Sequence, residues 1–165
     1  MAIRSLKDAD LSAIAEINNM YLGNGTMQLQ PVVGQDFRIF LPGQSDRHAL
    51  LVKELEERIV GYSLVKPYSD REGYRRAGET SVYLHPDAIG EGYGKRLMNC
   101  IISAAKELEY RYLAAKIWTN NQKSIAFHEQ LGFRIVGVQR GIGWVEGHPV
   151  DVTIMEAQLD ELLSD

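Results

Sequence analysis

A cluster of glycines between residues 89 and 96 is the segment whose composition most directly indicates chemistry. Closely spaced glycines leave main-chain N–H groups uncovered and let a ligand approach the backbone. If a helix follows, its N-terminus adds donors that suit a phosphate or pyrophosphate. The segment therefore predicts either a phosphate-binding loop or a tight turn. Its sequence is Ile89-Gly90-Glu91-Gly92-Tyr93-Gly94-Lys95-Arg96.

Two common phosphate-binding motifs do not fit this spacing. A Walker loop requires Ser or Thr after its Gly-Lys pair, whereas Arg96 follows Gly94-Lys95. A dinucleotide fingerprint requires glycine at its first, third and sixth positions, and no glycine stands at the sixth position counted from Gly90 or Gly92. What remains is a pyrophosphate cradle of another type or a plain turn.

The elements expected around this loop are seven strands and four helices. Apolar and β-branched runs predict strands at residues 2–6, 49–54, 59–65, 79–85, 113–118, 133–139 and 150–158. Helices are expected from Asp8 to the glycines at 23–25, at 37–41, from Gly92 to about residue 108, and from Asn120 or Asn121 to Leu131. The glycine-rich residues 140–149 are expected to form a loop. These connections predict an α/β (α+β) fold, with a mixed central sheet flanked on both faces by helices.

Bulk properties favour one globular domain over residues 1–165. The chain is 45% apolar and 24% charged, and its net charge of −4 argues against nucleic acid as a partner. No secretory signal and no run of about 20 apolar residues occurs, so a cytoplasmic protein without membrane contact is expected. The single cysteine, Cys100, excludes an internal disulfide and is expected in the core. The histidines lack metal-ligand spacing, so no metal is expected.

The glycine loop and a second motif together resemble the GNAT superfamily of N-acetyltransferases. The family's Arg/Gln-x-x-Gly-x-Gly/Ala signature corresponds to residues 89–94, with Ile89 in place of the usual Arg or Gln. Residues 121–133 resemble the family's second cofactor motif. Within the family, the run from Glu79 to Tyr83 and the His128-Glu129-x-Leu-Gly segment resemble phosphinothricin and methionine-sulfoximine acetyltransferases.

This resemblance implies an enzyme that moves the acetyl group of acetyl-coenzyme A (acetyl-CoA) to the primary amine of a small molecule, an amino acid or analogue. It implies direct attack without an acyl-enzyme, with Glu79 as general base and His128 as donor of a proton to the leaving thiolate. Residues implied in cofactor binding are Val82, Tyr83, Leu84, Ile89, Gly90, Glu91, Gly92, Tyr93, Gly94, Lys95, Asn121 and Ser124.

Other roles are less specific. Arg71 and Tyr74 precede Glu79 and are candidates for binding the substrate, as is His148 on the last hairpin. A helix cap explains Asn121 equally well, and a buried structural histidine explains His128. A homodimer is common in the phosphinothricin group and is a candidate state here.

Two other functions fit parts of the sequence. A protein or peptide N-acetyltransferase needs a wide groove beside the same cofactor loop. A non-catalytic CoA-binding regulator needs the loop but no base, so Glu79 argues against it.

Overall fold

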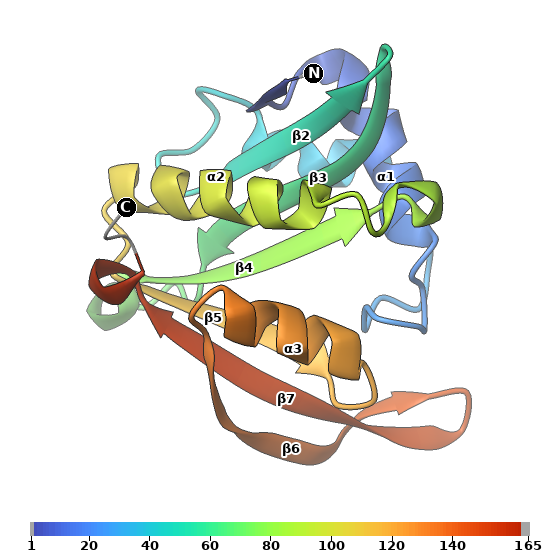
Figure 1. Cartoon of the computed structure of the whole chain (residues 1–165), viewed down its shortest axis with the longest axis vertical. Coiled ribbons are helices and arrows are strands. Elements are labelled where there is room, and N and C mark those ends of the chain that lie inside the picture. The colour runs from blue at the N-terminus through green and yellow to red at the C-terminus, as the bar shows by residue number, and fades with distance from the viewer. Residues whose placement is uncertain (1, 163–165) are drawn as a thin grey trace.

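The computed structural model describes residues 2–162 and contains one mixed sheet of seven strands. Their order across the sheet is β1-β2-β3-β4-β5-β7-β6 (Figure 1). Only β4 and β5 pair in parallel; the other neighbours are antiparallel. The expected sheet of about seven strands is confirmed. The strands are β1 Ile3–Ser5, β2 Ala49–Leu55, β3 Arg58–Pro67, β4 Ala77–Leu84, β5 Tyr112–Trp118, β6 Arg134–Val145 and β7 His148–Gln158.

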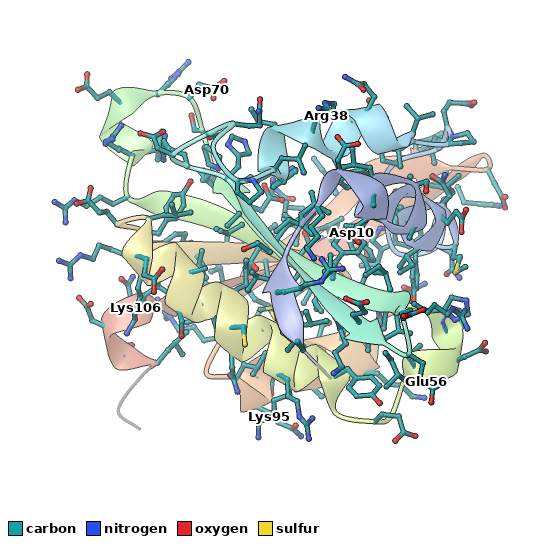
Figure 2. The ribbon with its side chains drawn as sticks, turned by 90° about the horizontal axis from the view of Figure 1, so that it is seen from above. Asp10, Arg38, Glu56, Asp70, Lys95 and Lys106 are labelled. Atoms are coloured by element: carbon teal, nitrogen blue, oxygen red, sulfur yellow. The ribbon has the colours of Figure 1, made fainter. Side chains whose placement is uncertain are left out.

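Three α-helices and one longer 3-10 helix accompany the sheet, in agreement with the expected four. They are α1 Leu11–Asn19, η2 Gly34–Phe40, α2 Tyr93–Glu107 and α3 Gln122–Gln130. Lys95 and Lys106 lie near opposite ends of α2 (Figure 2). Short 3-10 turns are Asp8–Asp10, Glu72–Tyr74, Pro86–Ala88 and Leu159–Glu161. Within residues 2–162, no helix has the length and apolar character that crossing a bilayer requires.

The helices cover both faces of the sheet, as expected, and create two cores (Figure 1). Helices α2 and α3 pack with Met155 and neighbouring residues on one face. Helix α1 and η2 pack on the other face against Val52 and Tyr62. Alternate strand residues point to opposite faces, so Leu50 joins the second core while Leu51 packs against the first.

Two local predictions, the end of the first helix and the burial of Cys100, were wrong, and one short helix has other bounds than expected. Helix α1 ends at Asn19, before the glycines, because the chain turns at Tyr21, whose side chain contacts β4 instead of extending the helical face. The expected helix at 37–41 is a 3-10 helix that begins at Gly34. Cys100 is exposed, because the buried stripe of α2 follows Leu97 and Ile101 and leaves position 100 on the outer side.

The predicted loop at 140–149 is a β-hairpin. Strand β6 continues to Val145 and pairs with His148 at the start of β7. The connecting Glu146 and Gly147 both have positive φ, which matches the twist of a two-residue hairpin turn. The glycines that suggested a loop accommodate irregularity within the strand: Gly141 has φ 65° beside a register shift.

Candidate active site

The site begins where the two parallel strands of the sheet stop pairing. The last β4–β5 partners are Glu79 and Ala114, yet β4 continues to Leu84 and β5 to Trp118. Beyond Glu79 the strands diverge, and we call the opening between them the split (Figure 1). Main-chain groups that would join two neighbouring strands are therefore left facing each other across a gap.

Strand geometry shows which main-chain groups face the split. The N–H of His85 donates to Val60 on β3 at 2.8 Å, while the carbonyl of Arg76 accepts hydrogen bonds from Arg111 and Tyr112 on the β5 side. Successive residues alternate in direction, so even-numbered residues of β4 point their N–H and C=O groups toward β5. Beyond Glu79 these residues are Thr80, Val82 and Leu84.

This alternation separates the three strand residues predicted to bind the cofactor. Val82 and Leu84 present main-chain N–H groups to the split, whereas the main chain of Tyr83 points to β3. The carbonyl of Leu84 already accepts a hydrogen bond from the Tyr21 hydroxyl. The N–H groups of Val82 and Leu84 are therefore the donors suited to a ligand carbonyl.

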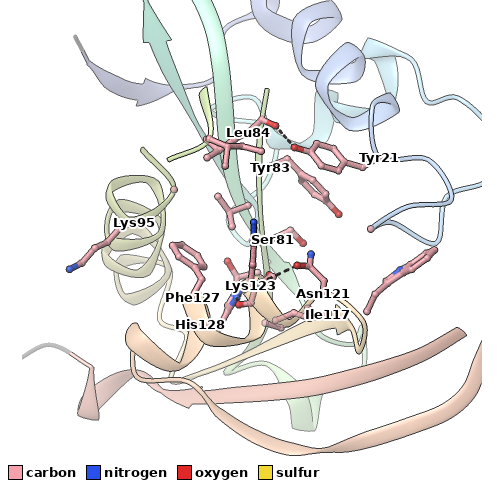
Figure 3. A pocket seen from close by; sticks show the side chains of 18 of the residues that line it. Tyr21, Ser81, Tyr83, Leu84, Lys95, Ile117, Asn121, Lys123, Phe127 and His128 are labelled. Atoms are coloured by element: carbon pink, nitrogen blue, oxygen red, sulfur yellow. Dashed lines mark hydrogen bonds between the residues drawn. The ribbon is translucent and has the colours of Figure 1, made fainter. Parts of the chain in front are cut away.

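The split opens into a cavity of about 470 Å³ (Figure 3). Its walls come from β4, β5, the glycine loop, α3 and the segment after α1. Lining residues are Tyr21, Gly25, Thr80, Ser81, Val82, Tyr83, Leu84, Ile89, Gly90, Gly92, Gly94, Lys95, Ala115, Lys116, Ile117, Trp118, Asn121, Lys123, Ser124, Phe127, His128 and Gln130.

The glycine loop has the geometry of a phosphate cradle. Gly90 and Gly92 have φ of 93° and 80°, values that favour glycine, and a Cβ built on either would meet no atom within 4 Å. Gly92 caps α2, whose first N–H groups have no partners within the helix. Open space, exposed amides and a helix N-terminus fit a ligand that carries a pyrophosphate.

Two residues of this loop do not reach the cavity. Glu91 is exposed and outside the lining. The ring of Tyr93 lies instead beneath the ammonium group of buried Lys53, 5.1 Å from its centroid. Of residues 89–95, only Ile89, the three glycines and Lys95 line the cavity, and their role in binding a cofactor stays a prediction.

Helix α3 and its N-cap bring three predicted residues to the opposite wall. The Asn121 side chain accepts a hydrogen bond from the Ser124 N–H at 3.2 Å, so Asn121 caps the helix and also lines the cavity. The Nδ1–H of His128 donates to the Ser124 carbonyl at 2.8 Å. Burial lowers the pKa of His128, because the charged ring is poorly solvated there. The neutral imidazole thus carries its proton on Nδ1 and a lone pair on Nε2.

The cavity is cationic although the chain is acidic. Lys95, Lys116 and Lys123 line it, and the described lining includes no Asp or Glu. The protein as a whole has a net charge of −4. This concentration of positive charge favours an anionic ligand. Among residues 2–162, no three His, Cys, Asp or Glu side chains gather in a group that would hold a metal ion.

Glu79 lies at the apex of the split, just outside the cavity lining. Its side chain is 17% exposed, and its Oε2 is 3.5 Å from the Lys116 ammonium. That ammonium also lies over the ring of Tyr68, whose centroid is 5.7 Å away. The carboxylate is thus partly buried and beside a cation that itself lines the cavity.

The predicted substrate-binding residues are less well gathered. Tyr74 packs against Tyr68 with a tilted ring, the two ring centroids being 5.7 Å apart, and so reaches the surroundings of Glu79 indirectly. Arg71 is exposed on the same connection, and His148 is exposed at the start of β7. None of Arg71, Tyr74 and His148 lines the cavity.

Half of the lining residues were not predicted from the sequence, and four of these carry a lysine ammonium, a phenol or an indole group. Tyr21 lies beyond the end of α1, and Lys123 is a helix residue between two predicted ones. Lys116 and Trp118 belong to a strand whose inner and outer faces are set by its neighbours. The alternation in β5 was visible in the sequence, but which face met a cavity was not.

Known proteins share this fold and are similar in sequence. The family model of the acetyltransferase (GNAT) domain matches residues 3–154. The chain therefore belongs to the GNAT acetyltransferases, and the resemblance noted in its sequence is confirmed.

Several relatives extend this comparison. The L-amino acid N-acyltransferase MnaT of Escherichia coli K12 is 34% identical over 98% of this chain and 95% of its own length. The L-methionine sulfoximine/L-methionine sulfone acetyltransferase of Salmonella typhimurium is 32% identical, covering 98% and 96%.

Solved structures agree with the sequence relatives. The structure of yncA from Salmonella typhimurium with its cofactor acetyl-CoA has a TM-score of 0.91 and 29% identity, covering 100% of this chain and 97% of that one. A phosphinothricin acetyltransferase from Sinorhizobium meliloti in complex with acetyl-CoA has a TM-score of 0.87 and 28% identity, covering 95% and 87%.

Proposed function

We propose that this enzyme transfers the acetyl group of acetyl-CoA to the amino group of an amino acid or a close analogue. The observation that carries this proposal is the cavity itself, which runs from a glycine cradle and lysines to the split beside Glu79. The names of the relatives support the acceptor class, and their solved complexes support acetyl-CoA.

The residues present fit acetyl-CoA. Its pyrophosphate suits the main-chain amides of Gly90 to Gly94, with Lys95 and Lys123 as counter-charges. Its amide-containing arm suits the unpaired edge of β4 and the side chains of Asn121 and Ser124. When bound, it supplies an activated thioester carbonyl. The N–H groups of Val82 and Leu84 are the donors that would stabilise negative charge on that carbonyl oxygen.

Glu79 is the proposed general base. An amine with a pKa near 10 is mostly protonated at neutral pH, and a carboxylate both holds the ammonium and takes its proton. Glu79 lies where the split begins, and its partial burial limits competition from water.

His128 is the proposed proton donor to the leaving thiolate. Its Nδ1–H is bound to the Ser124 carbonyl, so the donated proton would be carried on Nε2. Its lowered pKa makes the charged ring a stronger acid than an ordinary imidazolium, although one that is sparsely populated at neutral pH.

The test is calorimetric titration with acetyl-CoA, with ATP and NAD as controls, followed by thiol release in the presence of L-amino acids. We expect selective binding of acetyl-CoA, lost in Gly92→Glu because a carboxylate would enter the phosphate cradle. Lys106→Met serves as a control on the same helix. If acetyl-CoA does not bind, or ATP or NAD binds better, the proposal is wrong.

We further infer that the enzyme acts in the cytoplasm as a homodimer formed through β6. This strand is the edge of the sheet and carries exposed apolar side chains, a combination that proteins usually cover. They are Ile135, Val136, Val138, Ile142 and Trp144, each between 47% and 66% exposed.

A further inference from the structure

Lys116 and Trp118 form a pair on one face of β5 that the proposed mechanism does not use. Leu113, Ala115 and Ile117 point to the core under α2 and α3, so the side chains of Lys116 and Trp118 point to the opposite face. Two residues along a strand are about 7 Å apart. Both residues line the cavity beyond the apex of the split.

Trp118 lines the cavity and carries a buried hydrogen-bond donor without a partner among the described residues. Trp118 is only 8% exposed, and within the described chain its Nε1–H has no hydrogen-bond partner. A buried donor without an acceptor is destabilising, and such groups are rare unless a ligand or solvent satisfies them. Because this residue lines the cavity, an oxygen of the acceptor is a suitable partner.

The ammonium group of Lys116 is incompletely paired. Its distance of 3.5 Å from Glu79 Oε2 is longer than a direct charge-assisted hydrogen bond, which measures about 2.7–2.9 Å. It has three N–H donors, and its other described neighbour is the face of Tyr68. The cation is therefore able to bind a second oxyanion without leaving Glu79.

Glu79 and Lys116 place opposite charges side by side at the entrance to the split. An amino acid carries an ammonium and a carboxylate on one carbon, so it matches this pair with reversed signs. We propose that Lys116, with the indole N–H of Trp118, binds the α-carboxylate of the acceptor while Glu79 faces its amino group. This assignment rests on the proposed function and identifies residues that select amino acids over simple amines.

The experiment compares each acceptor with the same molecule lacking its carboxylate. Suitable pairs are L-phenylalanine with phenethylamine, and L-methionine sulfone with the corresponding amine. Wild-type enzyme is expected to prefer the amino acid. Lys116→Met should lower kcat/KM for the amino acid by roughly 10- to 100-fold more than for the amine, whose own change reports only the loss of the Lys116–Glu79 contact.

Trp118→Phe removes the N–H and keeps an aromatic ring. It should lower kcat/KM for the amino acid by roughly tenfold and spare the amine. Lys106→Met, a lysine on α2 outside the cavity, is the matched control and should change neither substrate. Calorimetric titration with acetyl-CoA checks that each variant is folded and binds the cofactor, which separates acceptor recognition from misfolding.

The outcomes distinguish this inference from the proposed function. If wild type acetylates amines as well as amino acids, or if Lys116→Met lowers both substrates equally, the carboxylate assignment is wrong and the acetyltransferase remains. If Lys116→Met changes nothing, Lys116 only pairs with Glu79 on the surface. If wild-type enzyme neither binds acetyl-CoA nor turns over any acceptor, the proposed function and this assignment fall together.

Discussion

At the scale of single residues, Glu79 decides whether the split is a reaction site. It occupies the last position of β4 that pairs with β5, and the unpaired Val82 and Leu84 amides lie further along the same strand. We predict that Glu79→Gln and Glu79→Ala lower kcat by roughly 10²- to 10⁴-fold near neutral pH, because no carboxylate accepts the proton of the ammonium. Steady-state kinetics across the pH range measures this effect.

The pH dependence of the activity of Glu79→Gln is a control for the role of Glu79 as base. Activity of Glu79→Gln should recover as pH rises toward the pKa of the amine, about 10, because the acceptor then loses its proton to solvent. Glu129→Gln, on the exposed side of α3, should behave as wild type. Full activity of both Glu79 variants at every pH would remove Glu79 from the reaction.

His128 makes a prediction about stability. Burial lowers its pKa in the folded protein below the ordinary value of 6.5, so the unfolded chain binds a proton first as pH falls. The stabilisation from the neutral ring is therefore complete above pH 6.5 and declines as pH drops toward the folded pKa. Urea unfolding measured between about pH 7.5 and pH 5 checks this. The unfolding free energy of wild type should fall more steeply with decreasing pH than that of His128→Gln.

The same variant tests chemistry. If His128 delivers a proton to the thiolate, His128→Gln should have a lower kcat than wild type. The decrease should exceed what the unfolded fraction of the variant accounts for. If the unfolding free energies of wild type and His128→Gln change equally with pH, the stability prediction is wrong. An unchanged kcat would leave His128 as a structural histidine between the rings of Phe127 and Phe133.

At the scale of elements, the sequence predicted those features that depend on residues close together along the chain. The apolar stripe of α2 and the Asn121 cap of α3 depend on residues a few positions apart, and both are confirmed. The hairpin at 140–149 was missed because its glycines suggested a loop. Gly143 lies against the Met27 side chain, a contact between distant segments that no local pattern shows.

The residues of the candidate site also fall into two groups, those predicted from local motifs and those that depend on how the sheet is arranged. The glycine loop and the start of α3 were predicted as motifs, and the fold brings them to one cavity. Lys116 and Trp118 were not predicted, because a strand residue faces a cavity only where the neighbouring strand departs. That departure, after Glu79 and Ala114, is a property of the whole sheet.

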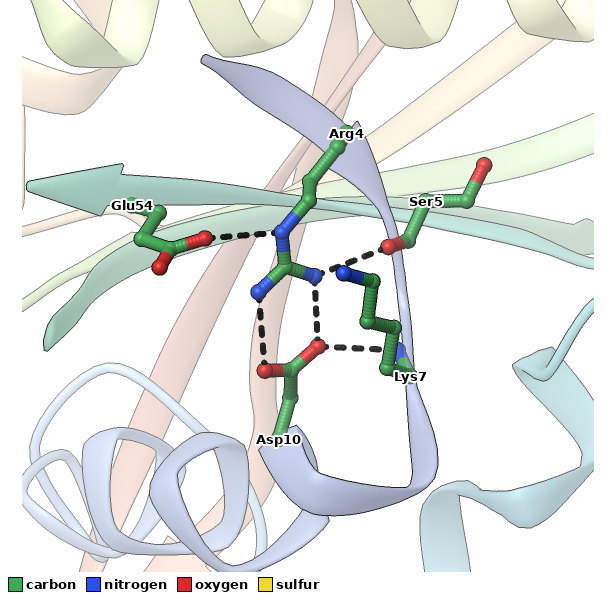
Figure 4. Close-up of polar contacts among 5 residues, drawn as sticks. All are labelled: Arg4, Ser5, Lys7, Asp10 and Glu54. Atoms are coloured by element: carbon green, nitrogen blue, oxygen red, sulfur yellow. Dashed lines mark hydrogen bonds and ion pairs between the residues drawn. The ribbon is translucent and has the colours of Figure 1, made fainter. Parts of the chain in front are cut away.

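An ion-pair network joins the first elements of the fold (Figure 4). Arg4 of β1 makes a bidentate contact with Asp10 at 2.8 and 3.1 Å and a third bond to Glu54 of β2 at 2.8 Å. Burial alone would raise the pKa of Asp10, but the bonds from Arg4 and the Lys7 N–H outweigh it and lower that pKa. Asp10 is therefore a buried anion that depends on Arg4.

We predict that Arg4→Met costs about 2 kcal/mol of unfolding free energy, because it leaves the Asp10 carboxylate buried without its cation. Urea denaturation at neutral pH measures this loss. Arg38→Met is the matched control: its pair with Asp8 is exposed at 43% and 73%, and such pairs contribute about 0–1 kcal/mol. Equal losses in the two variants would contradict the prediction.

The difference in unfolding free energy between wild type and Arg4→Met should become smaller in acid. The Asp10 pKa is depressed in the folded protein, so the stability it contributes is present above its ordinary value of 3.8 and is lost as pH falls through the folded pKa. The gap between wild type and Arg4→Met is therefore expected to narrow below pH 3.8.

At the scale of the whole molecule, charge and apolar surface are segregated. The lysines of the cavity lie within an acidic chain, which favours attraction of an anionic cofactor to one place. The apolar side chains of β6 lie on the sheet edge beyond β7, away from the glycine loop. The cavity and the proposed dimer surface are therefore separable by mutation.

The final prediction uses this separation. Ile142→Lys and Val138→Lys place charges on β6 and should shift the protein from dimer to monomer, because a like charge from each copy would be buried at the contact. Sedimentation velocity over a range of concentrations measures the change, with Ile39→Lys, an exposed apolar residue on η2, as the control. Affinity for acetyl-CoA should persist in the monomer, because the described cavity is lined without any β6 residue. A wild-type protein that sediments as a monomer at every concentration would show instead that β6 is tolerated as an uncovered edge.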